Sequence, residues 1–124
     1  MKALAASFLI LSLPASAEWV ELFNGKDFTN FGAPGKTEQN GYFVKDGIIE
    51  SSRKCRNLIT EKQYADYILE FEFQLTPGAN NGLGVHYPGS GDAAYTGMEL
   101  QILDNTADKY KNLKEWQFHG SVYS

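Results

Sequence analysis

The stretch GMELQILDN, residues 97–105, carries the residues best suited to chemistry. Glu99 and Gln101 alternate with Met98, Leu100 and Ile102, so a β-strand here would place the carboxylate and the amide on one face. A carboxylate can transfer a proton, whereas an amide can only donate and accept hydrogen bonds. The polar face is therefore either an ordinary solvated surface or the floor of a site.

Neighbouring segments repeat this alternation. Residues 67–75, 83–87, 98–102 and 117–123 each place apolar and polar side chains on opposite sides, as in antiparallel sheets with one solvated face. If the four pair as neighbours, their polar faces form one surface without lysine. Its members are Glu70, Glu72, Gln74, Gly84, His86, Glu99, Gln101, His119, Ser121 and Tyr123. Such groups can hydrogen-bond sugar hydroxyls, aromatic rings can stack on a pyranose, and glycines leave room for a ligand.

Glu99 and His119 are the candidate catalytic residues. Glycoside hydrolysis commonly uses two carboxyl groups about 5–9.5 Å apart. Glu99 and Asp104 lie about 16 Å apart along an extended strand, and their side chains point to opposite faces, so they can pair only if the strand bends or bulges before Asp104. A better partner for Glu99 comes from an adjacent strand: Glu72, Glu70 or His119. The candidate substrate-binding residues are Gln101, His86, Asp104, Glu72, Tyr123 and Asn81.

Several of these residues also have a purely structural interpretation. Asp104 suits a turn that ends a strand, and Asn81 lies in an Asn-Asn-Gly run typical of a tight turn. Gln101 could bond across strands, and Tyr123 could pack at the edge of the sheet. No His/Asp cluster has the spacing of a metal site, and we expect neither a metal nor a cofactor.

The rest of the chain predicts an all-β domain. Residues 19–23, 42–44, 48–50 and 57–60 have the pattern of short strands, and Lys45-Asp46-Gly47 predicts a hairpin turn. Residues 105–116 contain the only plausible helical turn. Many short strands separated by Gly, Asn and Pro indicate a β-sandwich or a barrel.

Charge, cysteine content and a processing signal indicate the location of the protein and the partners that it is not expected to bind. Residues 1–17 have the basic start, apolar run and small-residue cleavage site of a signal peptide, and the run is too short to span a bilayer. The formal net charge of −4 disfavours a nucleic-acid partner. The single cysteine, Cys55, cannot form an intramolecular disulfide.

The motifs FNGKDFTNF, NGYFVKDGIIES and GMELQILDN, the last followed by HGSVY, resemble the 3-keto-disaccharide hydrolase family of exported bacterial proteins. The resemblance runs from Trp19 to the end of the chain. It implies a concanavalin A-like jelly-roll β-sandwich of antiparallel strands whose concave sheet binds a small-molecule carbohydrate, and a periplasmic or extracellular location. Family members often carry Arg at the position of His86. Family domains continue past HGSVY, so residues 18–124 are expected to be an N-terminal portion, truncated at the C terminus.

The activity that the resemblance implies is hydrolysis of a glycosidic bond in a sugar oxidised at C3. The ketone acidifies the C2 proton, so elimination of the C1 substituent followed by addition of water is a second route, with Glu99 and His119 as base and acid. His86 or a bound cation could polarise the ketone. Two alternatives remain open: a non-catalytic carbohydrate-binding module on the same sandwich, and a fragment or structural module without activity.

Overall fold

The computed structural model describes residues 18–123, so the expected signal peptide lies outside the described residues. The chain divides into two compact units, Met1–Gln63 and Tyr64–Ser124. Each unit holds one three-stranded antiparallel sheet, and the helical elements are single turns. The all-β prediction is confirmed, and two small antiparallel sheets are consistent with a β-sandwich. Within residues 18–123, no helix has the length and apolar character needed to cross a membrane.

The first unit confirms the predicted hairpin. Its sheet has the order β1 (Glu38–Gln39), β2 (Tyr42–Lys45) and β3 (Ile48–Ser51), preceded by η1 (Thr29–Phe31). Asp46 and Gly47 connect β2 to β3 with φ values of 52° and 77°. Two consecutive residues with positive φ make the tight turn that fits the twist of a hairpin.

Two strands expected in the first unit do not form. Residues 19–23 and 57–60 are irregular, because loop side chains take up their carbonyl groups. The Asn30 amide donates to the carbonyls of Glu21 and Leu22, both at 3.1 Å, and the Asn40 amide donates to that of Asn57 at 3.1 Å. The core of this unit is small, with Phe28 fully buried and Ala33 5% exposed.

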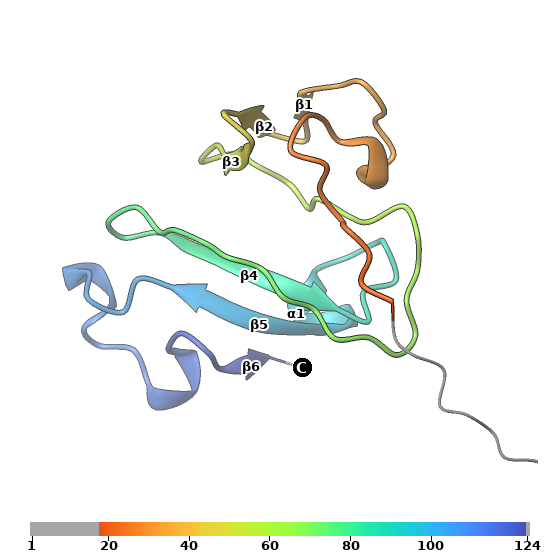
Figure 1. Ribbon diagram of the computed structural model, residues 1–124. Helices are drawn as coiled ribbons and strands as arrows, with labels where there is room; N and C mark the ends of the chain where they lie inside the picture. Colours follow the sequence, from red (N-terminus) through yellow and green to blue (C-terminus); the bar gives the residue numbers. More distant parts are fainter. Residues whose placement is uncertain (1–17, 124) are drawn as a thin grey trace, which may run out of the picture. The chain divides into compact units, whose positions relative to one another are not determined.

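The second unit is built around a β4-β5-β6 sheet (Figure 1), formed by β4 (Asn80–Val85), β5 (Met98–Leu103) and β6 (Val122–Tyr123). Along the ladder, Gly84 lies opposite Glu99, and Glu99 lies opposite Tyr123. Gly82 lies opposite Gln101. Because residues opposite each other in a ladder share a face, the predicted polar face exists across these three strands.

The fourth strand of that predicted surface is absent from the described sheet. Residues 67–75 alternate most clearly in the sequence, but they form no β-pairing. The segment leaves apolar side chains exposed, with Ile68 at 75%, Phe71 at 47% and Phe73 at 50%. Alternation predicts which side chains a strand would bury, but a strand forms only where its backbone groups find a partner. Glu70, Glu72 and Gln74 therefore lie outside the sheet.

The tight turn expected at Asn80-Asn81-Gly82 does not form. Asn80, Asn81 and Gly82 belong to β4 and form no tight turn. The turn lies at residues 76–79, where the Ala79 amide donates to the Thr76 carbonyl at 2.9 Å. Gly78 has a φ of 73° there, which glycine adopts without steric cost and asparagine less readily.

The last segment folds as turns that lead into a short strand. Residues 105–116 were expected to hold one helical turn, and the structure has the short 3₁₀ turns η2 (Asp108–Tyr110) and η3 (Glu115–Gln117). A further single turn, α1 (Ala93–Thr96), forms where no helix was predicted, since residues 105–116 were expected to hold the only helical turn.

The expected strand at residues 117–123 is reduced to β6 by a bulge. The Gln101 carbonyl accepts from the Gly120 amide at 2.9 Å, and the Gln101 amide donates to the Ser121 carbonyl at 2.8 Å. Gly120 has a φ of 86°, so residues 120 and 121 together oppose Gln101 as a G1 bulge. In an unbroken strand His119 and Tyr123 would point to the same face of the sheet. The extra residue breaks this alternation, so His119 does not share the face of Tyr123.

Candidate functional site

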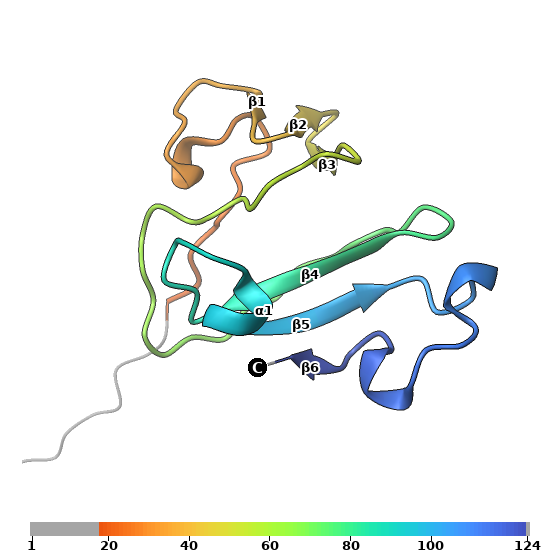
Figure 2. The ribbon, with the colours of Figure 1, turned by 180° about the vertical axis from the view of Figure 1, so that it is seen from behind.

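Glu99 lies over a floor made by the glycines of β4. A Cβ atom added at Gly82 would collide with the Glu99 carboxyl group, so this carboxyl lies directly above the Gly82 backbone. A Cβ at Gly84 would lie 3.1 Å from the Cβ of Ala93, and α1 packs against both β4 and β5 (Figure 2). The two glycines thus make room for the Glu99 carboxyl and for α1 on the same face.

Gln101 makes this face unlike an ordinary solvated surface. The residue is only 8% exposed, and its side-chain amide makes no hydrogen bond to any residue in the described range 18–123. Within residues 18–123 the buried side-chain atom without a hydrogen-bond partner is Gln39 Oε1 in the first unit, so the Gln101 amide still reaches solvent at this face. This amide is a free hydrogen-bonding group next to the Glu99 carboxyl, as in a binding site.

The environment of Glu99 favours the protonated carboxyl. Partial burial raises the pKa of Glu99 above 4.5, and the negative charge of Asp92 raises it further. Asp92 is the N-cap of α1, where its carboxylate accepts from the Ala94 amide at 3.0 Å. A carboxylate with a raised pKa is a stronger proton acceptor than an exposed one.

Tyr123 extends the face on the other side of β5. It lies opposite Glu99 in the ladder, and its ring centroid is 5.8 Å from that of Trp116, with the ring planes at 66°. Trp116 belongs to η3 and is 58% exposed. The site therefore combines a carboxyl, an unpaired amide and an aromatic pair on three neighbouring segments.

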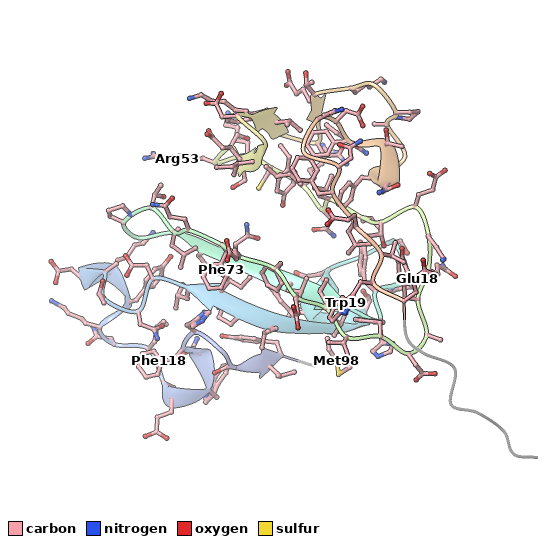
Figure 3. All side chains as sticks on the ribbon, in the orientation of Figure 1. Glu18, Trp19, Arg53, Phe73, Met98 and Phe118 are labelled. Carbon is pink, nitrogen blue, oxygen red and sulfur yellow. The ribbon has the colours of Figure 1, made fainter. Side chains whose placement is uncertain are left out.

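His119 does not join Glu99 on this face. Its Nδ1 accepts from the Leu103 amide at 3.4 Å, and its ring centroid lies 5.5 Å from that of Phe73, whose side chain is labelled in Figure 3. Leu103 is four residues from Glu99, which is about 13 Å along the strand, and strand N–H groups point within the plane of the sheet. The imidazole therefore lies beside the end of β5, in the plane of the sheet and away from the face that carries Glu99.

Three predicted binding residues also lie away from Glu99. His86 follows the end of β4 with a φ of 53°, and its ring lies 6.5 Å from that of Tyr67. Asn81 lies opposite Ile102 in the ladder and so on the reverse face of the sheet. Glu72 is exposed on the unpaired segment 67–76. The structure thus groups Gln101 and Tyr123 with Glu99, and leaves these three outside that group.

Asp104 ties the end of β5 to the turn before β4. One carboxylate oxygen accepts from the Gly78 amide at 2.7 Å, and the other accepts from the amide and hydroxyl of Thr106 at 3.0 and 2.6 Å. The bond from Gly78 is the main reason that the pKa of Asp104 lies below 3.8, followed by the bonds from Thr106. This geometry matches the strand-ending turn considered from the sequence.

Replacing Asp104 with asparagine should destabilise the protein in a pH-dependent way. Because the hydrogen bonds from Gly78 and Thr106 hold the pKa of Asp104 in the folded protein below the usual 3.8, the carboxylate stabilises the folded state above that pH and loses this effect as pH falls through the folded pKa. Thermal unfolding should show a lower Tm for Asp104→Asn at pH 7 and no difference at the acid end. Asp66→Asn, at an exposed carboxylate, is the control and should change little at any pH. An equal Tm for Asp104→Asn and wild type at pH 7 would contradict the role given to these bonds.

Sequence reasoning missed three contributors to the site. Gly82 was assigned to a turn, Asp92 to a loop, and Trp116 to a helical turn without a role. The signal for Asp92 was present, since Asp directly before Ala-Ala is a typical N-cap. Within residues 18–123, no three His, Cys, Asp or Glu side chains are grouped as metal ligands.

Comparison with known proteins gives one result. A family model described as the 3-keto-alpha-glucoside-1,2-lyase-like domain matches residues 18–124. No curated protein and no solved structure matches the chain.

Proposed function

Because the chain belongs to the family of 3-keto-alpha-glucoside-1,2-lyase-like domains, we propose that it cleaves the glycosidic bond of α-glucosides whose C3 carries a ketone. The Glu99 carboxyl over its glycine floor is the observation that supports this proposal most directly. It is a proton-transfer group held beside the unpaired Gln101 amide, which can bind a hydroxyl or a carbonyl oxygen of the sugar.

In the proposed reaction Glu99 acts as the base. The ketone at C3 acidifies the hydrogen on C2, and the Glu99 carboxylate removes that proton. The C1–O bond then breaks as a C1=C2 double bond forms, and the departing oxygen takes up a proton. Water adds across the double bond, with OH at C1 and H at C2, so that the sum of the two steps is hydrolysis. One well-placed carboxylate is sufficient for the first step, which agrees with a face that holds Glu99 and not the edge residue His119.

A carbohydrate-binding module without chemistry is the second candidate. The aromatic pair and the Gln101 amide would serve it equally well, because binding hydroxyl groups needs no titratable side chain. The raised pKa of Glu99 favours the enzyme, since perturbed carboxyl groups are typical of proton transfer and carry a cost in a simple binding site.

The proposal is tested with the full chain and two glucosides. Methyl 3-keto-α-glucoside should release methanol, while methyl α-glucoside, which lacks the ketone, should not. In D₂O the sugar product should carry deuterium at C2, after correction for exchange without protein, because elimination removes that hydrogen and direct hydrolysis does not. Release of methanol from both glucosides, or from neither, would overturn the proposal. Methanol release from the keto sugar without deuterium at C2 of the product would support the proposed activity but contradict the elimination route.

A further inference from the structure

The exposed Trp116 and the half-buried Tyr123 form an aromatic pair next to the face that carries Glu99. Tyr123 lies opposite Glu99 in the ladder, and the two ring centroids are 5.8 Å apart. Trp116 is 58% exposed, although a tryptophan is among the side chains that gain most from burial. No step of the proposed reaction uses either ring.

The turn that carries Trp116 is held firmly in place. The Lys114 amide donates to the Gln117 side chain at 3.1 Å, and the Gln117 amide donates to the Lys114 carbonyl at 2.9 Å. The Ser121 hydroxyl donates to the Glu115 carbonyl at 3.3 Å, which ties η3 to the residue before β6. The indole is therefore presented on a fixed support, and a ligand that stacks on it need not order the turn.

The aromatic pair adjoins the Glu99 face on its β6 side. Tyr123 lies opposite Glu99 in the ladder, where the Cα atoms of opposite residues are about 5 Å apart, and the ring centroid of Trp116 lies 5.8 Å from that of Tyr123. We infer that the Trp116–Tyr123 pair stacks the sugar ring on the leaving-group side of the scissile bond, while the oxidised ring lies over Glu99. The inference rests on the proposed function, and it makes this site selective for disaccharides over simple glucosides.

The test compares two substrates that differ in this second ring. Trehalose oxidised at C3 of one glucose unit carries the second ring, and methyl 3-keto-α-glucoside lacks it. Trp116→Ala should lower kcat/KM for the oxidised trehalose about tenfold more than it lowers kcat/KM for the methyl glucoside, the difference expected for one aromatic contact. Trp116→Phe should recover most of the loss. Trp19→Ala, at an indole that is 67% exposed in the other unit, is the matched control.

The outcomes separate this inference from the function on which it rests. Equal losses on both substrates would mean that Trp116 supports the fold or the catalytic face, and no loss on either would mean that the ring is unused; both overturn the inference. If the wild type turns over neither substrate, tryptophan fluorescence decides. In a Trp19→Phe background Trp116 is the only indole, so quenching by unoxidised trehalose would support the stacking site without the reaction, and no quenching would overturn it.

Discussion

Glu99→Gln should lower kcat for methyl 3-keto-α-glucoside about 10²- to 10⁴-fold, the range that general acid–base groups supply. The glutamine keeps the size of the side chain but cannot accept the C2 proton. KM should change little, because the amide can still hydrogen-bond the sugar. Methanol release under saturating substrate measures the effect, and Glu50→Gln on exposed strand β3 is the control.

The thermal stability of Glu99→Gln shows whether a loss of activity comes from misfolding. Because partial burial raises the pKa of Glu99 in the folded protein above the usual 4.5, the folded state binds more protons than the unfolded chain between the unfolded and the folded pKa values. Stability is therefore lost as pH rises through this window, and the ionised Glu99 opposes folding above it. Glu99→Gln should have a Tm equal to or above that of wild type at pH 7, with this gain absent below the unfolded pKa. Full activity in a well-folded variant would remove Glu99 from catalysis.

The parts of the fold that the sequence predicts well depend on neighbours close along the chain. The hairpin at residues 42–51 follows from Asp46-Gly47, whose positive φ values set the turn and with it the register. The alternation of residues 98–102 likewise predicts which side chains share a face with Glu99, because the period of a strand is fixed by its backbone geometry.

The errors arise where distant groups decide the outcome. Residues 67–76 alternate as clearly as any strand, but pairing requires a backbone partner that periodicity does not identify. The bulge opposite Gln101 depends on Gly120, and it moves His119 from the predicted face to the edge of β5. The predicted Glu99–His119 pair assumed an unbroken alternation from residue 117 to residue 123, so one inserted residue was enough to separate the two side chains.

Gly82 should matter to activity as a position that must lack a side chain. In Gly82→Ala the new Cβ would occupy the place of the Glu99 carboxyl, so that carboxyl must move away from the β4 backbone. Displacing a reacting group by about 1 Å can cost about 10²-fold in rate, and we expect a loss of that size in kcat for methyl 3-keto-α-glucoside. The fold should tolerate the change, because Gly82 is not among the glycines with positive φ and alanine loses less backbone entropy than glycine on folding.

A double variant shows whether Gly82 acts through Glu99. If the alanine harms activity only by displacing the carboxyl, then Gly82→Ala combined with Glu99→Gln should be no slower than Glu99→Gln alone, because the group that the alanine displaces can no longer take the proton. Losses that multiply would instead mean that the alanine blocks the sugar itself, and the floor would then be a contact surface for substrate. Near wild-type activity in the single Gly82→Ala variant, with an unchanged Tm, would show that activity does not depend on the position of the Glu99 carboxyl above β4. That result would contradict the assignment of this face as the catalytic site.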